Sequence, residues 1–370
     1  MPRTLTVMQL LPALESGGVE RSTLEIGAAL VDAGHHSLVV SAGGRLVPEL
    51  ERGGSRHVAL DLGHKSLRTL RHVHRLRRLI EVERPDIVHA RSRLPAWIAH
   101  FALRGLSGPR PALVTSVHGL NSPGRYSGIL TRGERVICVS RTVRDYVLRH
   151  YPGTDPQRLR VIERGVDPAA FPRDFVASAA WQREFFAGHP ALEGGVLLTL
   201  PGRGTRLKGH AEAIRLLAAL RAQGIDARGL LLGAEERGRE AYLRELRELA
   251  RVLQVEAVLV ISPPRNDVRE VMSISALVLQ LSSKPEAFGR TAAEALSLGR
   301  PVLGFDHGGV GEILAHHFPA GGVAPGAAGV LVQRALDLLR APPPVPLYDG
   351  ATLARMQAAT LAVYAELCRD

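Results

Sequence analysis

The stretch ALVLQLSSKPEAFGRTAAEALSLGRPVLGF, residues 276–305, decides the fold of this chain. Its first apolar run predicts a buried strand, and Pro285 prevents that run from continuing as a helix. Small helix formers follow from about Arg290 to Leu298, and Gly299 predicts the end of the helix before a second apolar run. A helix between two buried strands is typical of a parallel βαβ unit, so we expect a parallel sheet.

The same alternation of apolar runs and helical periodicity extends over most of the chain. It pauses once, at residues 167–195, a segment rich in Pro, Gly and Ala that we interpret as a hinge. We therefore expect an α/β fold with two doubly wound, Rossmann-like domains, residues 1–172 and 173–350, followed by an amphipathic helix at 351–370. Ligands of such open sheets bind beyond the carboxyl ends of the strands, here in a cleft between the domains.

Composition narrows the class of protein. The chain has 370 residues, 45% of them hydrophobic, which is enough for two cores. No apolar run reaches the roughly 20 residues that span a bilayer. Cys138 and Cys368 are its only cysteines, so a reducing cytoplasm fits, and a disulfide framework or a cysteine-based zinc site does not.

The formal net charge of +11 predicts attraction to phosphates, whether of a nucleotide, a nucleic acid or an anionic membrane. Aromatic residues make up only 4% of the chain, which argues against a single-strand nucleic-acid binder that needs stacking platforms. No zinc-finger or RNA-binding signature is present in the sequence. We therefore expect no nucleic-acid partner.

Two candidate phosphate-binding residues, Arg203 and Lys208, lie in LTLPGRGTRLKGH, residues 198–210, between the end of a strand and a helix that starts near His210. Arg203 can form paired hydrogen bonds with phosphate oxygens, and Lys208 supplies a mobile point charge. The spacing is not that of a P-loop. Two interpretations stay open, a diphosphate site and a solvated basic loop.

Two carboxylates flank the start of the helix in the deciding stretch. Glu286 lies in the loop before Gly289, and Glu294 lies about one turn into the helix. The free amides from Gly289 to Thr291 point out of the helix start and form an anion site, while carboxylates accept hydrogen bonds from vicinal sugar hydroxyls. The alternative is structural, with Glu294 favoured by the helix dipole and Glu286 paired with Arg290.

Two further features lie in the first domain. Gly17 and Gly18 separate a strand from a helix and allow close approach of a ligand or backbone, although a full GxGxxG is absent. His118 ends another strand, so its ring should face the ligand-binding edge of the sheet. A lone histidine is more often structural, and this interpretation also stays open.

Taken in order, GGVE, SVHG, VIERGVD, GRGTRLKG and EAFGRTAAEALSLGRPV resemble the retaining glycosyltransferases of the GT-B fold, the group 1 family classed as family 4. The resemblance covers nearly the whole chain, and its Glu-x7-Glu spacing is the most specific part. It implies two Rossmann-like domains facing a central cleft, with the last helix packing back on the first domain. The family often has Asn where this chain has Arg164, which leaves a phosphate contact or a solvent-facing side chain open for that residue.

The resemblance also implies a role for each matched residue. The transferred sugar would contact His118 and Glu286, and the ribose would contact Glu294. Arg203 and Lys208 would bind the donor diphosphate and offset the charge that develops on it. The implied catalytic residues are His118, Arg203, Lys208 and Glu286. The implied donor-binding residues are Gly17, Gly18, Arg203, Lys208, Glu286, Phe288, Gly289, Arg290, Thr291 and Glu294.

The implied activity is a retaining, metal-independent transfer of a hexose from a nucleotide-diphosphate sugar, with a UDP-sugar favoured, and without a cofactor. Front-face attack and a covalent intermediate on Glu286 both stay open. The implied acceptor is a cell-envelope glycan or glycolipid, foremost the lipopolysaccharide core, met in the cytoplasm or at the inner membrane. The alternatives are another GT-B nucleotide-sugar enzyme such as an epimerase, and a non-catalytic basic module that binds membrane or nucleic acid.

Two segments of the first domain are candidates for the acceptor side. Arg125 and Tyr126 lie in the loop after His118. Residues 64–80 predict an amphipathic helix, which is either a surface helix with a solvated basic face or a contact to an anionic leaflet. Its apolar positions are Leu67, Leu70, Val73, Leu76, Leu79 and Ile80, and its basic positions are Lys65, Arg68, Arg71, Arg75, Arg77 and Arg78.

Overall fold

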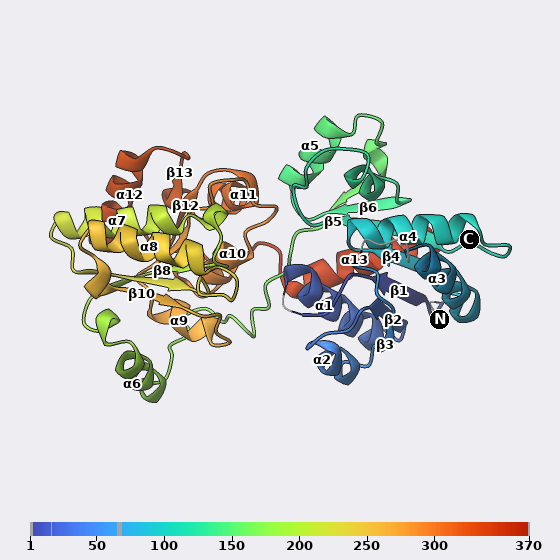
Figure 1. Cartoon of the computed structure of the whole chain (residues 1–370), viewed down its shortest axis with the longest axis horizontal. Helices are drawn as coiled ribbons and strands as arrows, with labels where there is room; N and C mark the ends of the chain where they lie inside the picture. The colour runs from blue at the N-terminus through green and yellow to red at the C-terminus, as the bar shows by residue number, and fades with distance from the viewer. Residues whose placement is uncertain (1–2, 16, 65–68, 369–370) are drawn as a thin grey trace. The chain divides into compact units, whose positions relative to one another are not determined.

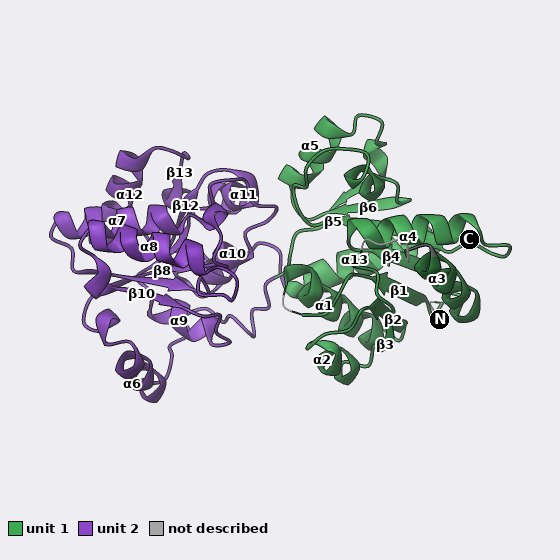
Figure 2. Cartoon of the chain, in the orientation of Figure 1, with its two compact units in different colours: residues 1–165, 353–370 green, residues 166–352 purple. Residues whose placement is uncertain are grey.

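The computed structural model describes residues 3–15, 17–64 and 69–368 (Figure 1). The chain forms two compact units: unit 1, residues 1–165 and 353–370, and unit 2, residues 166–352 (Figure 2). The sequence placed these boundaries after residues 172 and 350. In the structure the amide of Val166 donates to the carbonyl of Ala351 at 3.0 Å, so the two segments that connect the units are hydrogen-bonded to each other. Pro and Gly content marks a loop, but it does not reveal which segments of the chain are hydrogen-bonded to each other.

Unit 1 is built on a seven-stranded parallel sheet with the strand order β3-β2-β1-β4-β5-β6-β7. Its strands are β1 (Thr6–Leu10), β2 (His36–Ser41), β3 (Arg56–Ala59), β4 (Ile87–Ala90), β5 (Ala112–Val117), β6 (Arg135–Cys138) and β7 (Leu159–Val161). Its helices are α1 (Gly18–Asp32), α2 (Val47–Arg52), α3 (Thr69–Glu83), α4 (Arg93–Arg104), η1 (Ser127–Thr131), α5 (Arg141–His150), η2 (Pro156–Arg158) and α13 (Leu353–Leu367).

The core of unit 1 joins the two ends of the chain. Apolar side chains of α1 and α13 pack with the central strands in one buried cluster. Ile26, Leu30, Val363 and Tyr364 come from the two helices, and Val7, Ile87 and Val114 come from the sheet. The last helix is therefore part of unit 1, although unit 2 separates it from the rest of that unit in sequence.

Unit 2 contains a six-stranded parallel sheet with the order β10-β9-β8-β11-β12-β13. Its strands are β8 (Val196–Pro201), β9 (Ala227–Leu232), β10 (Leu259–Ser262), β11 (Leu277–Gln280), β12 (Val302–Phe305) and β13 (Gly322–Val323). Its helices are α6 (Ala179–Gly188), η3 (Pro190–Leu192), η4 (Arg206–Lys208), α7 (His210–Ala222), α8 (Glu240–Val252), η5 (Glu256–Val258), α9 (Val268–Ile274), α10 (Arg290–Ser297), α11 (Gly308–His317), η6 (Pro319–Gly321) and α12 (Ala328–Arg340).

The two parallel, doubly wound sheets confirm the predicted fold class. In each sheet the strand order reverses once, between β1 and β4 in unit 1 and between β8 and β11 in unit 2. The carboxyl ends of the strands at such a switch point form the usual ligand crevice. The residues after β1 and β4, and those after β8 and β11, are therefore where a site is expected. Across the described ranges, no helix combines the length and apolarity needed to cross a membrane.

Candidate functional site

Lys208 is held by the loop that follows β8. The next residue, Gly209, has a φ of 79°, and a Cβ there would lie 1.9 Å from the carbonyl oxygen of Leu281. Only glycine permits this left-handed backbone and this close approach. Because Leu281 follows β11, the contact brings the loops after β8 and β11 together at the switch point.

Glu286 lies in the second of these loops and is fixed by three contacts. Nζ of Lys208 is 2.8 Å from its Oε1, and the hydroxyl of Ser282 donates to the same oxygen. The backbone is held as well, because the amide of Gly309 donates to the carbonyl of Glu286 at 2.8 Å. The structure therefore pairs Glu286 with Lys208, while Arg290 pairs with Glu294 at 2.9 Å. This overturns the alternative in which Glu286 pairs with Arg290.

The helix start predicted after Gly289 is present. Gly289 has a φ of 107° and precedes α10, and a Cβ there would lie 2.7 Å from Cγ2 of Val310. The first amides of a helix lack intrahelical acceptors, so those of Arg290 and Thr291 are available to an anion. The side chain of Phe288 is buried, so that residue can offer a ligand only its backbone.

Arg203 does not join this cluster. Its side chain is exposed and forms no hydrogen bond or ion pair with the described residues. The structure thus brings Lys208 to Glu286, in the loop that leads into α10, and leaves Arg203 at the surface of the loop after β8. Because the side chain of Arg203 is long and flexible, it can turn toward a ligand once one is bound.

Ser282 and His307 support Glu286, and sequence reasoning did not find either of them. His307 donates from Nε2 to the carbonyl of Ser282 at 2.8 Å, and it immediately precedes α11. The sequence signal that could have found His307 was the DHGGVG stretch after β12, because its glycines lie at the start of a helix, as Gly289 does. Gly308 has a φ of 63°, and a Cβ there would lie 2.5 Å from the carbonyl oxygen of Glu286.

In unit 1, His118 follows β5 and is held by Arg164. Nη2 of Arg164 lies 3.0 Å from Nδ1 of His118, and Nη1 donates to the carbonyl of Gly18 at 2.7 Å. Arg164 is only 8% exposed, so the solvent-facing interpretation of this residue is wrong. Burial, followed by the charges of Arg164, Arg91 and His89, holds the pKa of His118 well below its ordinary value. The ring is therefore neutral near pH 7.

Arg91 is a second buried cation that sequence reasoning missed. It follows β4, and its two terminal nitrogens donate to Oε1 of Gln9 at 2.6 Å and to Oγ of Ser22 at 2.5 Å. Its Nε is buried without a hydrogen-bond partner among the described residues. The only signal was an arginine directly after the apolar run DIVHA, at the end of a strand.

A cavity of about 300 Å³ opens at this end of the unit 1 sheet. It is lined by residues that follow β1, β4 and β5, among them Arg91, Arg93 and His118. Glu20, on the first turn of α1, is the one acidic residue that lines it among those described. The cavity therefore combines cationic and neutral hydrogen-bond donors at the switch point of unit 1.

Gly17 and Gly18 form the start of α1, as predicted. Gly17 has a φ of −126°, and a Cβ there would meet only the carboxylate end of the Glu20 side chain, while a Cβ on Gly18 would meet no atom within 4 Å. The protein backbone therefore does not itself require glycine at either position. On the acceptor side, Tyr126 lies under the guanidinium of Arg93, 5.3 Å from it, and Arg125 is exposed.

The predicted basic helix is α3, which begins at Thr69. Leu76 and Ile80 are buried, while Arg71, Arg75 and Arg78 are exposed. Arg77 does not belong to the exposed basic face, because its guanidinium donates to carbonyls at the end of α4, those of Phe101 and Ala102. The predicted positions Lys65, Leu67 and Arg68 lie outside the described residues.

Within the part of the chain that the structure describes, no three His, Cys, Asp or Glu side chains come together as metal ligands. The absence of a metal or cofactor requirement stays a prediction, which rests on the resemblance.

Two family models match the chain. The model described as Glycosyltransferase Family 4 matches residues 16–170, and that described as Glycosyl transferases group 1 matches residues 182–347. A D-inositol 3-phosphate glycosyltransferase of Jonesia denitrificans is 35% identical over 168 residues, which are 44% of this chain and 38% of the relative. The matched segment thus spans well under two thirds of that curated relative.

Solved structures match over the full length. A glycosyltransferase of Rickettsia africae is 26% identical, with a TM-score of 0.87 and coverage of 99% of both chains. Anabaena HepE, solved with UDP and glucose, is 19% identical, with a TM-score of 0.80 and coverage of 97% of this chain and 99% of that one. The second likeness shows the fold alone.

Proposed function

Because the chain belongs to the Family 4, group 1 glycosyltransferases, we propose that it transfers a hexose from a nucleotide-diphosphate sugar, with retention at the anomeric carbon. One observation carries the proposal: Nζ of Lys208 lies 2.8 Å from Oε1 of Glu286, in the loop that leads to the free amides at the start of α10. A cation and a helix start suit a diphosphate, and a fixed carboxylate suits sugar hydroxyls. We propose a UDP-sugar as donor, which the complex of HepE with UDP and glucose supports.

In this proposal, donor binding exchanges one ion pair for another. Lys208 turns from Glu286 to the diphosphate, and Glu286 is released to accept hydrogen bonds from the transferred sugar. Charge develops on the leaving diphosphate as the sugar–phosphate bond breaks, and Lys208, Arg203 and the α10 amides stabilise it. These groups supply the stabilisation that a metal ion supplies in other enzymes. Glu294 binds the ribose, and it is already oriented by Arg290 at 2.9 Å.

We propose that unit 1 binds the acceptor in the cavity beside His118. A cell-envelope glycan or glycolipid, foremost a lipopolysaccharide core, fits its cationic lining and the exposed basic face of α3. The inositol phosphate named for the relative of Jonesia denitrificans is likewise an anionic polyol. Attachment to the cytoplasmic face of an anionic membrane through α3 belongs to the same proposal.

Calorimetry with UDP, GDP and ADP, and then with their glucose conjugates, tests the donor. We expect binding of one nucleotide diphosphate and tighter binding of its sugar. Binding of none of them contradicts a nucleotide-sugar enzyme and favours a basic binding module. Donor turnover measured with and without acceptor separates transfer from epimerisation, since an epimerase converts the sugar without any acceptor.

A further inference from the structure

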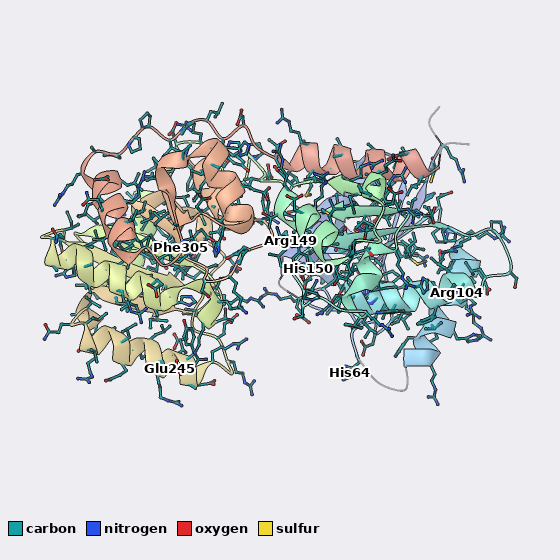
Figure 3. All side chains as sticks on the ribbon, turned by 90° about the horizontal axis from the view of Figure 1, so that it is seen from above. His64, Arg104, Arg149, His150, Glu245 and Phe305 are labelled. Atoms are coloured by element: carbon teal, nitrogen blue, oxygen red, sulfur yellow. The ribbon has the colours of Figure 1, made fainter. Side chains whose placement is uncertain are left out.

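A second hollow of unit 1, which we call the arginine groove, has no role in the function proposed above. Its volume is about 1010 Å³, and it lies between α4, the loop around η1, and the turn that joins α5 to η2. His150, labelled in Figure 3, is the last residue of α5 and lines it. The charged and aromatic residues that line it are Trp97, His100, Arg110, Arg125, Arg132, His150, Tyr151 and Arg158.

The cations of the arginine groove have little compensation. None of the described residues that line it is Asp or Glu. The carboxylate of Asp155 lies 3.7 Å from Arg158, but Arg110 and Arg125 are exposed and form no ion pair or hydrogen bond with the described residues. Positive charges that are held close together without a compensating carboxylate favour the binding of an anionic ligand.

His100, which lines the groove, lies close to several of these arginines. Burial lowers the pKa of His100, and the charges of Arg132, Arg104 and Arg110 lower it further. Arg104, labelled in Figure 3, ends α4 one turn beyond His100. Of these arginines, Arg132 and Arg110 line the groove together with His100.

Two hydroxyls show that the groove is more than a charged surface. Oγ1 of Thr154, a residue only 8% exposed, is buried without a hydrogen-bond partner among the described residues, and so is the hydroxyl of Tyr151. Leaving a buried hydroxyl unpaired is unfavourable, because the group has lost its hydrogen bonds to water. Both residues line the groove, where a polar ligand would pair them.

The groove shares two elements with the cavity beside His118. Arg93 lines the cavity, and Trp97, one turn further along α4, lines the groove. Asn121, in the loop after His118, lines the cavity, and Arg125 of the same loop lines the groove. The two hollows therefore lie on neighbouring stretches of α4 and of the loop after His118, and α4 contacts that loop between them, where Nε1 of Trp97 donates to the carbonyl of Tyr126 at 3.0 Å.

We propose that the arginine groove binds a phosphorylated saccharide, as the anionic extension of the acceptor. The arginines bind its phosphate oxygens through paired hydrogen bonds, and the hydroxyls of Tyr151 and Thr154 pair with its sugar or phosphate groups. Calling this ligand the acceptor rests on the proposed function, whereas the anion site itself does not. The phosphate can come from a soluble glycan or from a glycolipid headgroup.

The test compares trehalose 6-phosphate with trehalose by calorimetry on the full chain, at physiological salt and with excess UDP present. We expect the phosphorylated sugar to bind at least tenfold more tightly, because one charge-assisted contact is worth about 1.5–3 kcal/mol. Equal affinity for the two sugars overturns the proposal. A separate UDP titration without sugar tests the donor site. If UDP does not bind, the comparison of the two sugars still tests the groove.

Two variants localise the site. Arg110→Gln with Arg125→Gln should remove most of the preference for phosphate, whereas Arg52→Gln with Arg183→Gln, an equal loss of charge at exposed positions elsewhere, should keep it. Tyr151→Phe with Thr154→Val should weaken sugar binding while leaving the thermal midpoint unchanged or raised, since unpaired hydroxyls are removed. Equal loss in the charge variant and its control overturns the site.

Vesicles and an oligonucleotide decide between the remaining partners. A glycolipid source predicts that vesicles carrying a phosphorylated glycolipid compete with trehalose 6-phosphate, and that plain phosphatidylglycerol vesicles compete far less. The proposal is overturned if the phosphorylated sugar does not bind while phosphatidylglycerol vesicles or a single-stranded oligonucleotide bind in a groove-dependent way. That partner would then be the ligand of the groove.

Discussion

The guanidinium of Arg164 sets the tautomer of His118. Its Nη2 lies 3.0 Å from Nδ1 of His118, and a guanidinium can only donate, so Nδ1 accepts and the proton of the neutral ring sits on Nε2. That Nε2 is buried without a partner among the described residues. Since Arg164 also donates to Gly18 at 2.7 Å, one side chain links the start of α1 to the histidine.

Arg164→Asn should change both the tautomer and the titration of His118. An amide both donates and accepts, so the Nδ1–H form becomes populated, and loss of a positive charge raises the pKa of His118. Two-bond nitrogen–proton correlation spectra of the imidazole report both effects. Arg160→Asn, on β7, is the control and should leave the His118 signals unchanged. An unaltered His118 spectrum in Arg164→Asn contradicts the arrangement.

Lys208→Ala should abolish transfer while leaving the protein folded. In the proposed function Lys208 stabilises the leaving diphosphate, so its loss should lower kcat by about 10²–10³-fold. The Lys208–Glu286 pair is partly exposed, so its loss should cost at most about 1 kcal/mol of folding free energy. Initial rates and a urea unfolding curve measure the two effects. Arg206→Ala, in the same loop, is the control, and near-normal turnover in Lys208→Ala removes the phosphate role.

Glu286→Gln should separate recognition of the sugar from recognition of the nucleotide. The substitution keeps the shape of the side chain but frees Lys208 from its ion pair, so UDP alone should bind at least as tightly as in the unmodified protein. The additional affinity for the UDP-sugar, and transfer itself, should be lost. Calorimetry with UDP and with UDP-glucose measures the difference, and weaker binding of UDP would show that Glu286 acts on the nucleotide instead.

His210 should make unit 2 less stable in acid. Burial is the largest cause that lowers its pKa to about 4, so the unfolded chain takes up a proton first as the pH falls. Stability is therefore full above about pH 6.5 and declines between pH 6.5 and pH 4, by about 3 kcal/mol in total. Urea midpoints at pH 7.5 and pH 4.5 measure this loss. His210→Leu should flatten the dependence, and an equally steep loss in that variant assigns it to other groups.

The exposed basic face of α3 should mediate attachment to anionic membranes. Replacing Arg71, Arg75 and Arg78 with Gln should weaken binding to phosphatidylglycerol vesicles on the order of 100-fold, since each basic residue near the surface contributes about 1 kcal/mol. Sedimentation with anionic and neutral vesicles measures it. Replacing Arg52, Arg183 and Arg237 with Gln removes the same charge elsewhere and serves as the control. Equal binding to both vesicle types contradicts the attachment.

Local chemistry predicted well those features that depend on neighbours in sequence. The strand–helix–strand unit of residues 276–305, the start of α10 after Gly289 and the start of α7 at His210 all follow from apolar runs, glycines and helix formers. Arg91 and Ser282 could not be found in this way. Each follows a strand as an ordinary polar residue, and only the packing around it shows that it holds another group.

The sequence by itself determined the fold class, the cation and carboxylate types of the proposed donor site, and the glycines that shape its loops, because helix and strand preferences and turn geometry act within a few residues. Tertiary structure decided which of these side chains meet. The pairing of Lys208 with Glu286 spans 78 positions, and that of Arg164 with His118 spans 46. Such contacts depend on strand order, because parallel strands bring to one sheet edge residues that lie far apart along the chain.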